Sequence, residues 1–146
     1  MVSHLTSESY ACSITDYDTD TVILTGGYET YSRVERYGHS GLVETLPEFN
    51  QGRWAHGCSS YSKDGKKVFQ TFLILEIILD IKKYLVVGGY DGSEYLSSTE
   101  IFTPGTDSSW TKVSPLSRTF SFAGSVNLNN RIYLFGDYSS ILEIVF

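Results

Sequence analysis

The sequence is poor in the residues that mark several classes of protein. Only 3 prolines and 13 glycines occur among 146 residues, which excludes collagen-like and low-complexity chains. Two cysteines are too few for a disulfide-rich scaffold, so we expect a reduced, cytoplasmic chain. The start lacks the pattern of a secretory signal, and the longest apolar stretch, residues 68–81, contains Glu76 and Asp80. We therefore expect no membrane contact.

Positive charge is also scarce. Lysine and arginine number 11 against 17 acidic residues, which gives a net charge of −6. Because phosphate contacts need clustered cations, nucleic acid is not expected as a partner. What the chain has instead is aromatic residues, 14% of the total, with many β-branched side chains, and this composition favours strands.

An apolar segment that ends in glycine occurs three times: VILTGGY (22–28), YLVVGGY (84–90) and IYLFGDY (132–138). The first glycines of these copies, Gly26, Gly88 and Gly136, are separated by 62 and then 48 residues. Removing Val68–Lys83 shortens the first interval to 46, the same as the interval from Cys12 to Cys58. The chain is therefore interpreted as repeats of 46 to 49 residues, with an insertion at 68–83.

The insertion has two interpretations. It is either a genuine loop or a translated intron, since valine codons begin with GT and a lysine codon can end with AG. Loops of this length are seldom so apolar, which favours the intron, but a long loop is tolerated thermodynamically.

Each repeat is interpreted as four short strands separated by polar turns, the pattern of a propeller blade. Residues 1–8 are expected to be disordered and residues 9–146 to form the propeller segment. Within that segment we expect the tail of one blade at 9–20, a blade at 21–62, a blade at 84–128 and a partial blade at 131–146.

The repeats resemble the kelch repeat, in which a double glycine follows an apolar strand and precedes a spaced tyrosine and tryptophan. The copy at 84–128 matches best, and the first copy has leucine where tryptophan is expected. The resemblance implies an all-β, kelch-type propeller of four-stranded antiparallel blades. Kelch propellers close with five to seven blades, so this chain of about two and a half is expected to be a fragment whose missing blades come from a longer chain. The matching residues are Gly26, Gly27, Tyr37, Gly88, Gly89, Phe102, Trp110 and Gly136.

Candidate chemistry is sparse. Cys12 and Cys58 are interpreted as equivalent positions of successive repeats, so they are expected to be small buried strand residues rather than a disulfide or metal pair. Asp16, Asp18 and Asp20 lack the glycine and glutamate spacing of a calcium loop. No catalytic residue, metal ligand or cofactor is assigned.

The kelch resemblance implies that loops at one face of the propeller bind a protein partner. Arg53 and Arg118 are interpreted as recurring at equivalent positions, where they either brace turns or bind acidic motifs; Trp54 and His56 are further candidates. The implied function is a non-catalytic interaction module, either the substrate-presenting part of a ubiquitin-ligase adaptor or a cytoskeleton-binding protein. The alternatives are a fragment of a galactose-oxidase-like kelch enzyme and a gene fragment without function.

Overall fold

The computed structural model describes residues 10–64, 80–129, 131–136 and 140–145. These residues form eleven strands and no helix, and therefore no membrane-spanning helix. The strands make three antiparallel sheets, here called blades 1, 2 and 3. Blade 1 contains β1 (Cys12–Asp16), β2 (Thr21–Thr25), β3 (Val34–Gly38) and β4 (Gly41–Leu46); blade 2 contains β5 (Gly57–Asp64), β6 (Asp80–Val87), β7 (Thr99–Phe102) and β8 (Thr111–Val113); blade 3 contains β9 (Gly124–Leu128), β10 (Arg131–Gly136) and β11 (Ser140–Val145).

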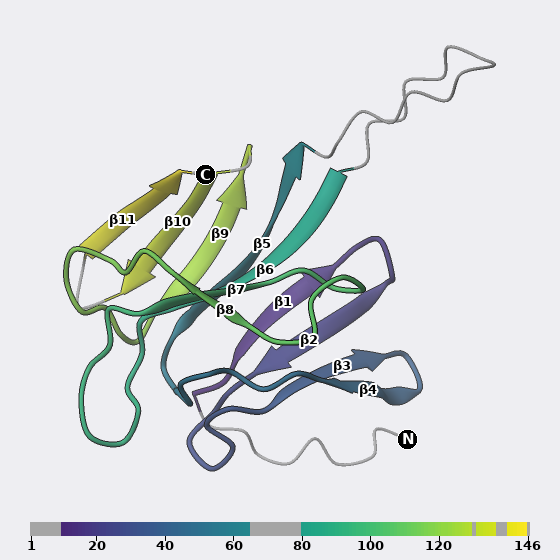
Figure 1. Cartoon of the computed structure of the whole chain (residues 1–146), viewed down its shortest axis with the longest axis horizontal. Coiled ribbons are helices and arrows are strands. Elements are labelled where there is room, and N and C mark those ends of the chain that lie inside the picture. Colours follow the sequence, from purple (N-terminus) through teal and green to yellow (C-terminus); the bar gives the residue numbers. More distant parts are fainter. Residues whose placement is uncertain (1–9, 65–79, 130, 137–139, 146) are drawn as a thin grey trace.

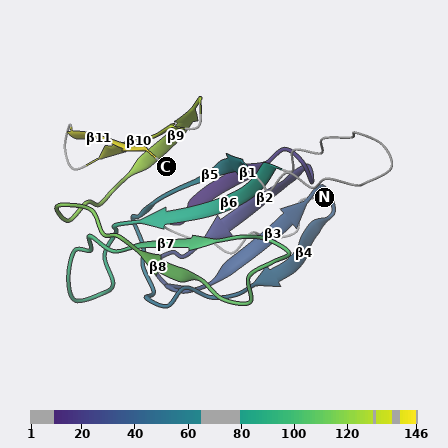
Figure 2. The same ribbon diagram turned by 45° about the horizontal axis from the view of Figure 1, so that its top comes forward.

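The three blades follow one another in an arc, with their first strands β1, β5 and β9 adjacent (Figure 1). The view in Figure 2 shows β9–β11 at one end and blade 1 at the other. The prediction of an all-β, partial propeller with antiparallel blades is confirmed.

The boundaries between blades differ from those expected. Residues 57–64 form the first strand of blade 2 instead of closing the blade at 21–62, and β9 likewise opens blade 3. Similarly, Cys12–Asp16 is the first strand of blade 1 and not the tail of an earlier one. The reason is pairing: β5 is hydrogen-bonded to β6 from Gly57↔Val87 to Asp64↔Asp80, and it contacts blade 1 through side chains of the first core cluster.

The expected insertion, 68–83, is partly built into blade 2. Strand β6 begins at Asp80, and residues 80–83 pair with 61–64. The Lys82 ammonium lies 2.6 Å from an Asp16 carboxylate oxygen and 2.8 Å from one of Asp18, which ties this strand to the first hairpin of blade 1. Residues 68–79 lie outside the described part of the chain, and whether they derive from an intron stays a prediction.

Apolar side chains fill the spaces between neighbouring blades. One cluster joins blade 1 to blade 2, and the indole of its Trp110 stacks on Phe102 with ring centroids 5.4 Å apart. A second cluster joins blade 2 to blade 3. The first consists of Ile14, Ile23, Val34, Phe49, Cys58, Tyr84, Val86, Phe102 and Trp110; the second consists of Tyr61, Leu85, Val87, Phe120, Ile132 and Leu134.

The repeated glycines stand where one blade meets the segment leading into the next. A Cβ on Gly26 would lie 2.3 Å from the Arg53 carbonyl oxygen, and one on Gly88 would lie 2.1 Å from that of Phe120. Both glycines have positive φ, +58° and +64°. A side chain here would collide with backbone and strain its own, which explains why glycine recurs at this position.

Candidate functional site

The strands β2, β6 and β10 lead into Gly26, Gly88 and Gly136, and we call this end of the blades the glycine end. A cluster of aromatic side chains lies there, centred on Trp54. The Trp54 ring centroid is 5.2 Å from those of Tyr10 and Tyr90, 5.7 Å from that of Tyr28 and 6.2 Å from that of Phe122. Tyr95 extends the group, 5.1 Å from Tyr90. We call Tyr10, Tyr28, Trp54, Tyr90, Tyr95 and Phe122 the aromatic cluster.

Backbone hydrogen bonds between segments hold this cluster in place. Trp54 and Tyr90 form a two-way bridge, with N···O distances of 3.0 and 2.9 Å, and the Ala55 N–H donates to the Tyr10 carbonyl at 2.9 Å. Tyr10, Ala55 and Phe122 each lie two residues before the first strand of a blade, and all three have φ between 50° and 63°. The same strained turn thus presents one residue per blade at this end.

The aromatic cluster offers a surface to a partner. Tyr10, Tyr28, Tyr95 and Phe122 are 55%, 52%, 53% and 47% exposed, while Trp54 is half-buried. The Trp54 indole N–H is buried and has no hydrogen-bond partner among the described residues. Half-exposed tyrosine and tryptophan combine a large apolar area with polar tips, the combination enriched at binding hot spots.

Acidic groups lie next to the cluster in sequence. Asp91 follows Tyr90, and its Oδ1 accepts hydrogen bonds from the N–H groups of Ser93 and Glu94 and from the Ser93 hydroxyl. These bonds hold the pKa of the Asp91 carboxyl well below its usual range. The loop that carries Tyr90 and Tyr95 is therefore both ordered and negatively charged.

Arg53 and His56, expected as candidate partner contacts, are buried. Arg53 is 0% exposed, and its guanidinium donates to Glu100 at 2.7 Å and to the carbonyl oxygens of Gly88 and Ser98 at 3.0 Å. Burial lowers the pKa of Arg53, and the Glu100 carboxylate opposes that shift. The arginine braces blade 2 from inside, so the expectation of direct partner binding is wrong for it.

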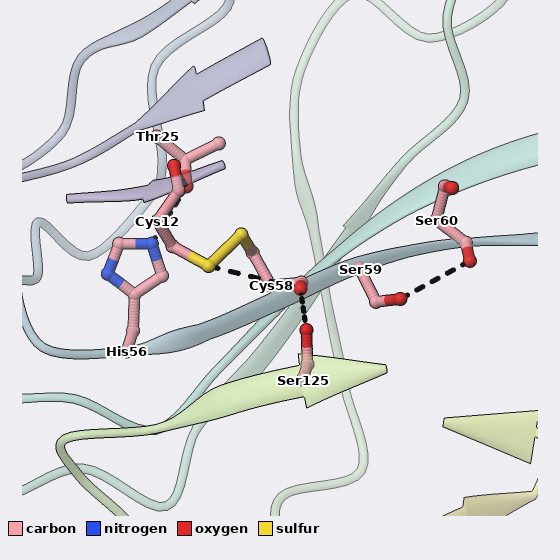
Figure 3. The surroundings of a disulfide bond; sticks show 7 residues. All are labelled: Cys12, Thr25, His56, Cys58, Ser59, Ser60 and Ser125. Atoms are coloured by element: carbon pink, nitrogen blue, oxygen red, sulfur yellow. Dashed lines mark hydrogen bonds between the residues drawn. A yellow bond between two sulfur atoms is a disulfide. The ribbon is translucent and has the colours of Figure 1, made fainter. Parts of the chain in front are cut away.

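His56 is 1% exposed and forms an internal chain of hydrogen bonds (Figure 3). The Thr25 hydroxyl donates to the Cys12 carbonyl at 3.0 Å and lies 2.9 Å from His56 Nε2, so that Nε2–H is the donor to the hydroxyl oxygen. Nδ1 has no hydrogen-bond partner in the described part of the chain. Burial, with the nearby Arg53 charge, lowers the pKa of His56 to about 3. A neutral, buried imidazole contributes to packing and not to partner binding.

Arg118 does not occupy the position of Arg53. The glycine contacts place Arg53 and Phe120 in equivalent positions, so Arg118 lies two residues earlier. Its side chain is exposed, with the guanidinium 5.3 Å from the centre of the Phe120 ring. Of the four expected candidates, Trp54 and Arg118 thus remain accessible to a partner.

Cys12 and Cys58 form a disulfide, with Cα atoms 5.9 Å apart, which corrects the prediction of two free thiols (Figure 3). Cys12 lies opposite Thr25, one residue before Gly26. Cys58 lies opposite Val86, two residues before Gly88. Successive strand residues point to opposite faces, so this one-residue offset turns the two side chains toward each other. Free cysteines were the basis for expecting a cytoplasmic chain, and that basis is removed.

Among the described residues, no three His, Cys, Asp or Glu side chains are arranged to hold a metal ion. The aspartates at 16, 18 and 20 contact nitrogen-bearing side chains: Asp16 and Asp18 contact the Lys82 ammonium, and Asp20 contacts the His39 imidazole.

Comparison with known proteins supports the kelch resemblance. Residues 85–117, from within β6 to just after β8, match the family described as the Kelch motif. No curated protein matches the chain significantly. Among solved structures, that titled "Structure of YjhT" matches with a TM-score of 0.70 at 15% identity, over 99% of this chain. This chain spans only 44% of the YjhT chain. The protein carries a kelch motif within the fold of a partial kelch-type β-propeller.

Proposed function

We propose that this protein is a protein-interaction module that binds a peptide segment of its partner through the aromatic cluster. The observation that carries the proposal is the gathering of half-exposed rings from all three blades around Trp54. Aromatic anchors of this kind dominate the binding energy of many interfaces. The role is non-catalytic, and presentation of a substrate to a ubiquitin ligase or attachment to the cytoskeleton are the specific uses that kelch repeats suggest.

A peptide library displayed on phage and selected on the folded chain tests the proposal. The tightest peptide is resynthesised, and its Kd is measured by calorimetry for the wild type and for Trp54→Ala. Loss of a central aromatic anchor, about 2 kcal/mol, corresponds to a Kd about 30-fold weaker. Phe122→Ser, which removes a more exposed ring, gives a second test that disturbs packing less.

Tyr17→Ser is the matched control, because Tyr17 is 86% exposed and lies in the β1–β2 turn at the opposite end. It leaves the Kd unchanged if the aromatic cluster is the site. Equal affinity of wild type and Trp54→Ala would overturn the proposal. Stoichiometric copper binding with oxidase turnover by the purified chain would favour the enzyme instead.

A further inference from the structure

The arc of blades has an open sheet face at each end. On blade 3 the open face presents Val126, Leu128 and Phe135, which are 47%, 58% and 44% exposed. On blade 1 the open face presents Val22, which is 38% exposed, beside the exposed Ser13 and Thr15 and the half-buried Leu24. Three apolar side chains exposed on one face of a sheet indicate that another protein surface packs against that face.

The register shows what the open face of blade 3 is built to contact. Counted from the glycine of each repeat, Val126, Leu128 and Phe135 occupy the positions of Ser59, Tyr61 and Val87 in blade 2. Those three residues of blade 2 are buried, and two of them lie in the cluster shared with blade 3. The open face of blade 3 therefore repeats a surface that packs against a following blade.

The open face of blade 1 repeats the opposite surface. Ser13, Val22 and Leu24 occupy the positions of Cys58, Tyr84 and Val86, which face blade 1 within the first core cluster. The two open faces are thus the two halves of one blade-to-blade interface, carried at opposite ends of the same chain.

The side chains at this interface are complementary in size. At the internal contact, the Tyr84 hydroxyl donates to Asp16 at 2.6 Å. On the open face of blade 1 the smaller Val22 replaces Tyr84, beside a hollow of about 410 Å³ lined by Thr15, Val22, Leu24 and Tyr37 among others. On blade 3 the position of Asp16 is taken by Leu128. In a head-to-tail contact Leu128 would lie opposite this hollow, whose surface is mostly apolar although Asp16, Asp20 and His39 also line it.

Polar groups repeat as well. Between blades 2 and 3, the Ser125 hydroxyl donates to the Cys58 carbonyl, and the Asn127 amide donates to the Ser60 carbonyl at 2.5 Å. Ser13 and Thr15 stand at the positions of Ser125 and Asn127 on blade 1. Their exposed hydroxyls can make the same contacts to strand β9 of the other copy, whose blade 3 precedes this blade 1 in the ring.

We propose that two copies of this chain associate head to tail, the open face of blade 3 of each covering the open face of blade 1 of the other, to close one six-bladed ring. A second copy is the occupant that this arrangement favours, because one sequence supplies both halves of the contact. Two copies, each matching 44% of the YjhT chain, also supply close to the length of one such propeller.

Light scattering coupled to size-exclusion chromatography tests the proposal on the purified chain. The expected mass is twice 16.4 kDa. Val22→Asp and Leu128→Asp each place a charge in the contact and are expected to give the mass of one chain. Thr111→Asp, a matched change at an exposed residue of β8 in the central blade, leaves the mass of two chains.

Mixing the two variants distinguishes head-to-tail association from other kinds of dimer. It also distinguishes a blocked contact from a variant that fails to fold. Val22→Asp keeps an intact blade 3 face, and Leu128→Asp keeps an intact blade 1 face. An equimolar mixture is therefore expected to regain the mass of two chains through one intact contact, whereas a symmetric dimer with a single shared patch would not recover.

A wild-type chain that keeps the mass of one copy at millimolar concentration would overturn the proposal, and would assign the open faces to blades elsewhere in a longer polypeptide. A dimer that both variants leave intact would overturn it too. The peptide-binding test of Trp54 concerns the glycine end of the blades, so either proposal can fail without the other.

Discussion

At the scale of single residues, the buried imidazole of His56 couples folding to pH. Its pKa is about 3 in the folded chain, against an ordinary value of 6.5. The unfolded chain therefore binds more protons between these values, so stability falls as the pH drops below 6.5. The loss is about 1.4 kcal/mol for each pH unit between the two values.

His56→Gln tests this coupling. The glutamine amide can still donate to Thr25 but takes up no proton, so we expect a less stable variant whose unfolding free energy changes less between pH 6.5 and 4. Urea unfolding at several pH values measures it. His39→Gln is the control, since the His39 side chain is 91% exposed. A wild type whose stability is flat across this window would contradict the assignment.

Protonation of the Asp16 carboxyl affects stability at a lower pH than protonation of His56. Burial would raise the pKa of its carboxyl, but the bonds from Lys82 and Tyr84 outweigh burial and lower it to about 2 from 3.8. A depressed carboxyl pKa contributes stability above 3.8 that is lost as the pH falls toward 2. The pH dependence above 3.8 therefore reports on His56, that below about 3 on Asp16, and the two overlap between these values.

A second prediction at the residue scale concerns substitution of the recurring glycine. Gly88→Ala would place its Cβ 2.1 Å from the Phe120 carbonyl oxygen at φ +64°. We expect the free energy of unfolding to fall by more than about 3 kcal/mol, since backbone strain and a backbone collision combine. Gly105→Ala, at φ +72° in open space, isolates the strain alone and should lose about 1 kcal/mol. Equal losses in the two variants, measured by urea unfolding, would contradict this interpretation.

At the scale of elements, the disulfide joins the first strands of two blades across 46 residues of sequence. The chain-entropy model assigns about 4 kcal/mol to a loop of this length. Cys12→Ser is expected to lower stability by an amount of that order, and a reductant should lower the wild type to match while leaving the variant unchanged. A wild type insensitive to reductant, or free thiols detected by mass spectrometry after alkylation, would show that the bond does not form.

The insertion offers a third kind of test. Deleting Val68–Lys83 brings Lys66 to the position of Lys82, because residues 64–67 (DGKK) resemble residues 80–83 (DIKK). The ion pair with Asp16 can then re-form, so we expect the deletion variant to fold with stability within about 1 kcal/mol of the parent, as measured by urea unfolding. Failure to fold would show that the segment belongs to the domain, and sequencing of the cDNA would decide whether the segment is an intron.

Repetition in the sequence was enough to predict the strands, the glycines and the kelch motif, but not where each blade begins. A repeating pattern gives the length of the unit but not the residue at which each unit begins. The strand at 57–64 can close one unit or open the next until its hydrogen bonds to β6 are known. The error over Cys12 and Cys58 has the same origin. Spacing counted along the chain made them equivalent, and the pairing register shifted one of them by a residue to the opposite face.

The candidate site was predictable only in part. Trp54 was found because a tryptophan beside a strand start is conspicuous, but the rings that surround it come from residues far apart in sequence. The ring centroids of Tyr10 and Phe122 are 6.0 Å apart only because the three blades pack side by side. Arg53 could not be assigned to the interior from sequence, since its partner Glu100 is 47 residues away.

At the scale of the whole molecule, association of two copies makes stability depend on protein concentration. If folding and closure of the ring are coupled, a tenfold rise in concentration stabilises the assembly by about 1.4 kcal/mol, which raises Tm by about 2 °C for two chains of this size. Leu128→Asp, confined to one chain, should have a Tm independent of concentration. Calorimetry over a thousandfold dilution series measures both. A wild-type Tm that stays constant across the series would mean that each chain unfolds alone, with the open faces of blades 1 and 3 exposed to water.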